Sequence, residues 1–190
     1  MFKQLQPFFT HNTLVRNLII LTLAGIWIWF SRAEPGSTTQ GNIPAPKEGF
    51  LAPEFTLESL SGEPISLADY RGQVVLINLW ASWCPPCRAE MPAMQAAYRD
   101  YQEQGFTILA VNATNQDNLA EAAQFVAQNQ LSFPILLDTQ GRVSDLYQLR
   151  SLPTSFIIDR AGIVREVIIG GPMSETLIQT KIAALLQETP

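Results

Sequence analysis

The sequence contains few of the residues that bind metals or cross-link a fold. Only two cysteines, Cys84 and Cys87, and one histidine, His11, occur in 190 residues. A structural zinc site usually takes about four ligands, and His11 lies far along the chain from the cysteine pair. We therefore expect no metal, no cofactor, and no fold stapled by several disulfides.

Basic residues are also scarce, and they are unevenly distributed. Three of the 12 lysines and arginines lie among the first 32 residues, which contain no acidic residue, and nine then remain against 17 acidic residues. Such a negative balance opposes binding to the phosphate backbone of a nucleic acid. Nucleic acid is therefore not an expected partner.

One long apolar run occurs, at residues 18–30, and it reads LIILTLAGIWIWF. Lys3 and Arg16 precede it, which is the charge pattern of a signal anchor whose N-terminus stays inside. The run is shorter than the ~20 residues that a membrane-spanning helix needs. Leu14 and Val15 extend it if the Arg16 side chain reaches the interface. We expect a membrane anchor within residues 1–33.

A cleaved signal peptide is the alternative, because Ser31-Arg32-Ala33 loosely fits the small-x-small pattern of a cleavage site. The bulky residues at 27–30 and Pro35 disfavour cleavage, so a retained anchor is preferred. Residues 34–49 are rich in proline, glycine, serine and threonine and should form a flexible tether. In either case residues 50–190 form an extracytoplasmic domain, in the periplasm, the cell exterior or a lumen.

The two cysteines follow a predicted buried strand and precede a predicted helix. Val74–Trp80 is a continuous apolar run, typical of a central strand covered on both faces. Cys84 would cap a helix over residues 85–104, with Pro85 at the first position, which tolerates proline. A helix N-terminus favours negative charge, and the thiolate is the reactive form of cysteine. A Cys-x-x-Cys pair at this place indicates redox chemistry.

Hydrophobic periodicity and turn residues predict the remaining elements. A short hairpin is expected from residues 55–57 and 65–67. Further strands are expected at residues 106–112, 133–137, 154–159 and 164–169, and helices at residues 118–129, 142–147 and 174–187. Asn118 and Glu121 have the spacing of a capping box, and Ser174 is a plausible cap for the last helix. The pattern predicts an α/β fold.

Three stretches of the domain carry a family resemblance. They read APEFTL at residues 52–57, GQVVLINLWASWCPPCRAEMP at residues 72–92 and LPTSFIID at residues 152–159. Together they resemble the thioredoxin superfamily, and more narrowly its membrane-anchored TlpA/ResA-type thiol–disulfide oxidoreductases. The resemblance covers about residues 50–188. It implies a thioredoxin-like fold with a central mixed sheet flanked by helices and an extra N-terminal β-hairpin.

The two cysteines take different expected roles. Cys84 should lie at the exposed helix tip and attack the target disulfide, and the resemblance implies that it forms the mixed disulfide. Cys87, one helical turn on, should be more buried and should resolve that mixed disulfide. Pro86 has no amide hydrogen, so Cys87 N–H remains as the main local donor to a Cys84 thiolate. A modestly stabilised thiolate favours a reductant.

Glu90 is the third expected catalytic residue. The resemblance implies a buried glutamate at this position that modulates the thiol pKa values and relays protons. Thioredoxins instead place a buried aspartate six residues before the first cysteine, where this chain has Asn78, which cannot titrate. The alternative is a solvated glutamate on the helix surface, paired with Arg88 or Arg99.

A substrate-binding set is expected around the cysteine pair. Pro153 matches the superfamily's cis-proline, and the alternative is an ordinary trans-proline that begins a strand. Leu152 would offer its backbone to an extended substrate chain. Trp83 would contact substrate or simply pack. The full expected set is Trp83, Pro85, Pro86, Leu152, Pro153 and Thr154.

The sequence thus predicts an extracytoplasmic thiol–disulfide oxidoreductase that reduces protein disulfides. The resemblance suggests apocytochrome c as a substrate, in cytochrome c maturation, and an upstream membrane thiol reductant as electron donor. A peroxiredoxin-like peroxidase is an alternative, because that branch shares the opening at residues 52–57. Ala81 stands where such peroxidases have threonine, which disfavours this alternative. A non-catalytic docking module is disfavoured by the intact Cys84–Cys87 pair.

Overall fold

The computed structural model describes residues 11–30 and 43–188, with side chains from residue 15 to 27 in the first range. The chain divides into two units, and the described part of the first is helix α1 (His11–Phe30). Within the described ranges, no helix combines the length and the apolar character that crossing a membrane requires. The anchor within residues 1–33 therefore stays a prediction. Residues 31–42, with the possible cleavage site and most of the predicted tether, lie outside the described ranges.

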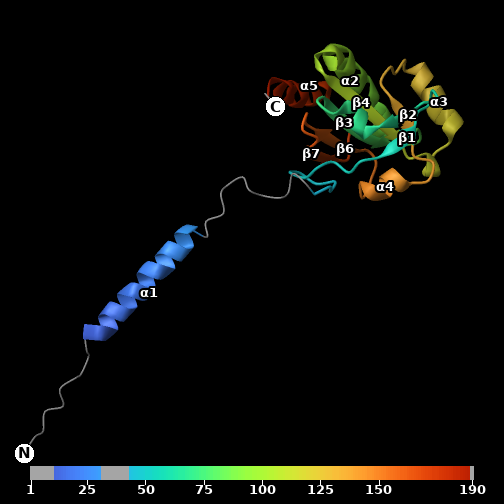
Figure 1. The fold of residues 1–190 in the computed structure, drawn as a ribbon. Helices are drawn as coiled ribbons and strands as arrows, with labels where there is room; N and C mark the ends of the chain where they lie inside the picture. Colours follow the sequence, from blue (N-terminus) through green and yellow to red (C-terminus); the bar gives the residue numbers. More distant parts are fainter. Residues whose placement is uncertain (1–10, 31–42, 189–190) are drawn as a thin grey trace, which may run out of the picture. The chain divides into compact units, whose positions relative to one another are not determined.

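The second unit is built on a five-stranded sheet with the order β5-β4-β3-β6-β7 (Figure 1). Its strands are β3 (Val74–Trp80), β4 (Phe106–Asn112), β5 (Ile135–Leu137), β6 (Thr154–Ile158) and β7 (Val164–Ile169). Strand β3 pairs in parallel with β4 and antiparallel with β6. The mixed central sheet expected from the sequence is confirmed, with β3 at its centre.

The predicted N-terminal hairpin is present as a separate small sheet. Strand β1 (Thr56–Glu58) pairs antiparallel with β2 (Pro64–Ser66), and a 3-10 helix (Leu67–Tyr70) follows at the predicted turn. A single bridge between Ser59 and Leu136 joins the hairpin to β5 at the edge of the large sheet. The hairpin therefore extends the domain at the β5 edge.

Four α-helices complete the described part of the domain, namely α2 (Pro85–Tyr101), α3 (Leu119–Gln128), α4 (Arg142–Leu146) and α5 (Glu175–Gln187). Two further 3-10 helices lie at Gln102–Gln104 and Thr114–Gln116. Ser174 caps α5 as expected, since its hydroxyl accepts from Leu177 N. The Asn118 side chain caps α3 by accepting from two amides of its first turn. The reciprocal half of the predicted capping box is wrong, because Asn118 N–H donates to the adjacent Asp117 carboxylate instead of to Glu121.

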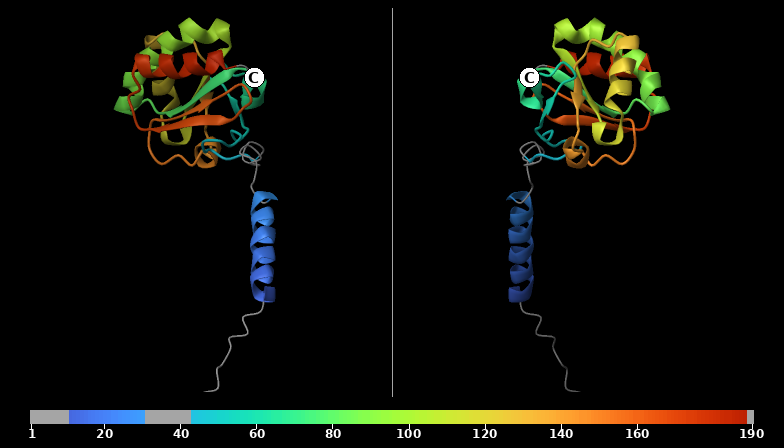
Figure 2. Two further views of the ribbon diagram at one scale, coloured as in Figure 1. Left: turned by 90° about the vertical axis from the view of Figure 1, so that its left-hand side faces the viewer. Right: turned by 90° about the vertical axis from the view of Figure 1, so that its right-hand side faces the viewer.

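The sheet separates two hydrophobic cores. One face of the sheet packs under α2, α3 and α5, and the other packs against α4, the hairpin and the segment that precedes it. Figure 2 shows α2 and α5 side by side, which agrees with their direct contact. All seven residues of β3 are buried, as the apolar run predicted. Burial of each valine, leucine and isoleucine among them stabilises the fold by about 1.5–3 kcal/mol.

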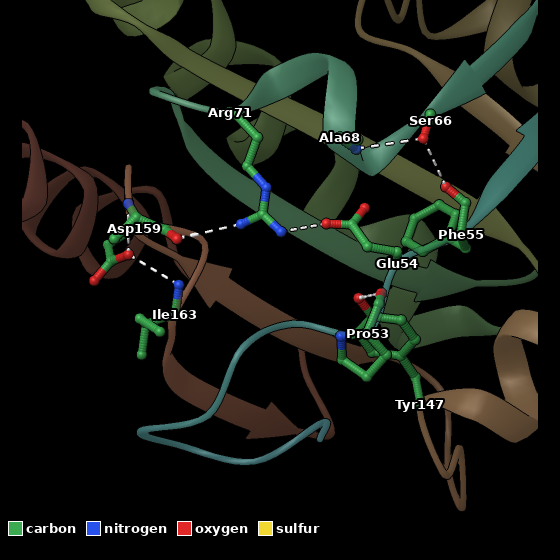
Figure 3. Close-up of polar contacts among 10 residues, drawn as sticks. Pro53, Glu54, Phe55, Ser66, Ala68, Arg71, Tyr147, Asp159 and Ile163 are labelled. Atoms are coloured by element: carbon green, nitrogen blue, oxygen red, sulfur yellow. Dashed lines mark hydrogen bonds and ion pairs between the residues drawn. The ribbon is translucent and has the colours of Figure 1, made fainter. Parts of the chain in front are cut away.

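Polar contacts fix the N-terminal part of the domain to the face that packs against α4 (Figure 3). The Tyr147 hydroxyl donates a 2.8 Å hydrogen bond to the carbonyl of Pro53. Arg71 forms an ion pair with Glu54 and donates to the carbonyl of Ala161. Residues 44–51, which include the end of the predicted tether, also make backbone hydrogen bonds with the domain. These contacts lie on the side of the sheet away from α2.

Candidate active site

Cys84 and Cys87 form a disulfide at the N-terminus of α2. Cys84 is the N-cap residue in extended conformation, and its sulfur accepts a 3.3 Å hydrogen bond from Cys87 N. Pro85 and Pro86 occupy the first two helical positions, where the amide would have no partner within the helix. The predicted placement of the pair between β3 and α2 is confirmed.

The predicted exposure of Cys84 is wrong in this disulfide form. Cys84 is 3% exposed and Cys87 is 0% exposed, so both belong to the core under α2. The reason is the cap geometry, which turns the Cys84 sulfur back over the first helical turn and toward Cys87. The neighbouring Trp83 is 55% exposed and is the residue that reaches solvent.

Glu90 is completely buried, one turn after Cys87, so the solvated alternative is wrong. Its Oε1 accepts a 2.8 Å hydrogen bond from the side-chain amide of Asn78 in β3. Its Oε2 accepts a 3.0 Å hydrogen bond from the backbone amide of Met173, in the segment between β7 and α5. Burial raises the pKa of Glu90 above its ordinary value, although these two donors oppose the shift.

Glu90 and Pro153 both lie close to Gly171. A Cβ atom added at Gly171 would lie 2.7 Å from Glu90 Oε2 and 2.8 Å from Pro153 Cγ. The Leu152–Pro153 peptide bond is cis, as the family resemblance implied. The Gly171–Pro172 bond is also cis, which the sequence did not indicate. The fold thus places the Gly171 segment against both the cis-proline and the carboxylate of Glu90, which lies one helical turn beyond Cys87.

The expected substrate-binding residues differ in their exposure. Trp83 and Pro85 are exposed, Pro86 and Leu152 are half-buried, and Pro153 and Thr154 are buried. The indole nitrogen of Trp83 donates to the carbonyl of Gln116, which fixes the orientation of the ring. The Thr154 hydroxyl donates to the carbonyl of Ser151, within its own loop. The exposed side chains of the set are therefore those of Trp83 and Pro85, the two neighbours of Cys84 in the sequence.

Sequence reasoning missed the roles of Asn78 and Gly171. Asn78 entered only as a residue that cannot titrate, yet it is the side chain that holds Glu90. A polar residue inside the apolar run of β3 was the available signal, because a buried polar group needs a partner. No sequence signal marked Gly171. In the described ranges, no group of three or more histidine, cysteine, aspartate or glutamate side chains is placed to hold a metal ion.

A disulfide between two cysteines one turn apart, at the start of a helix that follows the central strand, can be opened and closed by thiol exchange. This fold and this pair define a thioredoxin-like thiol–disulfide oxidoreductase. The model of the AhpC/TSA family matches residues 49–167, and the chain belongs to that family.

The chain is also similar to individual known proteins. The chain is 42% identical to the thiol-disulfide oxidoreductase ResA of Geobacillus thermodenitrificans over 131 residues. The aligned region covers 69% of this chain and 74% of that protein. A thiol:disulfide interchange protein from Chlorobium tepidum is similar in structure, with a TM-score of 0.66 and 28% identity, over 72% of this chain and 95% of that one. The structure of StoA from Bacillus subtilis is also similar, with a TM-score of 0.60 and 32% identity, over 67% of this chain and 95% of StoA.

Proposed function

We propose that this chain reduces disulfide bonds of other proteins on the extracytoplasmic side, by dithiol exchange through Cys84 and Cys87. The observation that carries the proposal is the disulfide itself, placed at the N-cap of α2 above a buried glutamate. The similarity to a thiol-disulfide oxidoreductase and to a thiol:disulfide interchange protein supports it.

The exchange proceeds in two balanced steps. The Cys84 thiolate of the reduced chain attacks one sulfur of the target disulfide, forming a mixed disulfide and releasing the first target thiolate, which takes up a proton. Cys87 then loses its proton and attacks Cys84 Sγ, which closes the Cys84–Cys87 disulfide and releases the second target thiolate. Two electrons pass from the dithiol to the target.

Cys84 is assigned as the attacking residue because its sulfur accepts a hydrogen bond from Cys87 N at the helix N-terminus. That donor and the helix dipole stabilise a thiolate at this position. Cys87 lies inside the first turn and is completely buried, which suits the residue that acts only within the molecule.

Glu90 is proposed as the proton carrier of the second step. A buried carboxyl with a raised pKa holds a proton closer to neutral pH than an exposed glutamate does. Resolution needs a base that takes the Cys87 proton and an acid that supplies one to the leaving thiolate. Glu90 lies one turn beyond Cys87 on the same helix. Its charged carboxylate can act as the base, and its neutral carboxyl can act as the acid.

The direction of electron flow follows from the two prolines. Pro85 and Pro86 have no amide hydrogen, and the Cys84 sulfur accepts from the Cys87 amide. A thiolate with one backbone donor is less stabilised than one with two or three. A less stabilised reduced form gives up its electrons more readily, so the pair acts as a reductant.

Leu152 is the proposed contact for an extended segment of the substrate. In the described part of the chain, neither its amide nor its carbonyl has a backbone partner, and its side chain is half-exposed. A substrate strand can therefore pair with this backbone while Trp83 and Pro85 flank it. Proteins with accessible disulfides, of which apocytochrome c is the proposed example, would be the substrates.

The membrane attachment through residues 1–33 and the upstream membrane thiol reductant are part of the same proposal. Lys3 and Arg16, the basic residues before the apolar run, support an anchor whose N-terminus stays inside and whose domain lies outside. This support comes from the sequence and not from the described helix. Protease added to the outer side of intact cells should remove the domain. Removal from the cytoplasmic side alone would contradict this location.

Insulin reduction tests the reaction. The reduced full-length chain should accelerate the cleavage of insulin disulfides by dithiothreitol, and Cys84→Ser should abolish the acceleration. Peroxide consumption measured in parallel tests the peroxidase alternative, which neither the site nor the relatives favour. Acceleration of peroxide consumption without insulin reduction would overturn the proposal.

A further inference from the structure

All three polar groups of Ser82, two residues before Cys84, are held by two charged side chains. Its amide and its hydroxyl each donate a 2.6 Å hydrogen bond to the carboxylate of Asp117, one to each oxygen. Its carbonyl accepts a 3.1 Å hydrogen bond from the guanidinium of Arg88. Ser82 is buried, so these bonds are largely protected from competition by water.

Asp117 is itself anchored to two elements of the fold. Its carboxylate also accepts from the side-chain amide of Asn112, at the end of β4, and from the backbone amide of Asn118, the cap of α3. Burial would raise the pKa of Asp117, but the hydrogen bonds from Ser82, Asn112 and Asn118 outweigh it and lower the pKa. The carboxylate therefore stays charged and connects the loop before Cys84 to β4 and α3.

Arg88 holds the same loop from helix α2. It lies in the first turn of α2, and its guanidinium carbon is 4.5 Å from the ring centroid of Phe125 in α3, a cation–π contact. The next residue along the loop is also held, because the Trp83 indole donates a 2.9 Å hydrogen bond to Gln116. Two consecutive residues before Cys84 are thus fixed to the segment at residues 112–118.

We propose that Asp117 and Arg88 are positioning residues that hold the loop at residues 81–83, so that the sulfur of Cys84 stays at the amide of Cys87. The inference rests on the proposed function only in taking Cys84 as the attacking thiol. When the loop is released, Cys84 samples positions away from its donor. The thiolate then loses stabilisation, the pKa of Cys84 rises, and the reduced form becomes less stable relative to the disulfide.

Asp117→Ala in the full-length chain tests this, with Asp117→Asn as the conservative variant. Glu121→Ala is the matched control, since Glu121 is an exposed acid in the first turn of α3. The measurements are the pH profile of Cys84 alkylation by iodoacetamide and the dithiol–disulfide equilibrium with glutathione. Neither uses a protein substrate, so a failure of the proposed function in the insulin assay leaves this test intact.

Asp117→Ala should slow alkylation at neutral pH about three- to tenfold, the range expected when one hydrogen bond to a charged group is weakened. It should shift the glutathione equilibrium toward the disulfide. Asp117→Asn keeps one acceptor oxygen but places an amide NH2 group against the donors of the other, so it should recover only part of both effects. Ser82→Ala removes only the hydroxyl contact and keeps the test valid if Asp117→Ala folds poorly. The inference would be overturned if Asp117→Ala and Ser82→Ala both had the same rate of Cys84 alkylation and the same glutathione equilibrium as Glu121→Ala.

Discussion

The side-chain amide of Asn78, at the centre of β3, donates a hydrogen bond to the buried carboxylate of Glu90 in α2. The same amide nitrogen donates a 2.9 Å hydrogen bond to the hydroxyl of Ser155 in β6. A donor to Glu90 favours its charged form, whereas burial favours its neutral form. The titration of Glu90 is therefore set by the central strand as well as by the helix that carries it.

Replacing Asn78 should change that titration. Asn78→Ala removes a donor to the carboxylate, so the pKa of Glu90 should rise further above its ordinary value. The cost in the free energy of unfolding should be about 1–3 kcal/mol, because a buried hydrogen-bonded group is lost. Carbon-13 NMR of the Glu90 carboxyl across pH measures the shift. Asn112→Ala is the control, since Asn112 is a buried strand asparagine that contacts Asp117 instead. A Glu90 pKa that is unchanged or lower in Asn78→Ala would contradict this.

Stability should depend on pH through Glu90. Its pKa is raised in the folded state, so the stabilisation due to the neutral carboxyl is fully present below the unfolded value of 4.5 and is lost as pH rises through the folded pKa. Glu90→Gln does not titrate. Its free energy of unfolding should therefore improve relative to the native chain as pH rises from 4.5 to neutral. Urea unfolding of the oxidised chains, in which neither cysteine titrates, measures this, and a difference independent of pH would refute it.

Glu90 should also affect the thiols of the reduced chain. A charged Glu90 and two thiolates oppose one another, so the three groups should titrate as a coupled set. In Glu90→Gln this repulsion is gone, and at least one thiol pKa should fall. Resolution of the mixed disulfide should slow, because the proton carrier is missing. The pH profile of alkylation and stopped-flow exchange rates report these effects. Identical profiles and rates in both chains would leave Glu90 without a chemical role.

The two cysteines should behave differently in trapping experiments. Cys87→Ala keeps the attacking thiol and removes the resolving one, so mixed disulfides with substrate proteins should accumulate. Cys84→Ala should accumulate far fewer. Non-reducing gels followed by mass spectrometry distinguish the variants. A stronger yield from Cys84→Ala would reverse the assigned roles.

Gly171 should tolerate no side chain. Its φ is not positive, so Gly171→Ala tests only the contacts with Glu90 and Pro153. Overpacking at this point should cost about 1–3 kcal/mol of stability and should slow disulfide exchange by displacing the loop. Gly25→Ala, where an added Cβ meets nothing within 4 Å, is the control. Thermal unfolding and insulin reduction measure both effects. A fully active and stable Gly171→Ala would show that the loop moves freely.

Much of the fold follows from local patterns in the sequence. The apolar runs predicted β3 and β4 with the observed bounds, and the turn residues predicted the N-terminal hairpin. The spacing of Cys84 and Cys87, with proline at the first helical position, predicted the cap of α2. These features depend on neighbouring residues, because capping, burial periodicity and turn geometry act over a few positions.

The environment of the site was decided by the tertiary structure. Asn78 meets Glu90 12 residues away, Asp117 meets Ser82 across 35 residues, and Met173 meets Glu90 across 83 residues. No local pattern encodes such pairs, because they depend on β4 lying beside β3, on the segment after β7 reaching α2, and on α2 covering that face of the sheet. The burial of Cys84 has the same origin. The sequence by itself determined which atoms carry the redox chemistry, and the packing of β3, α2 and the Gly171 segment determined the burial and hydrogen bonds that set the Glu90 pKa.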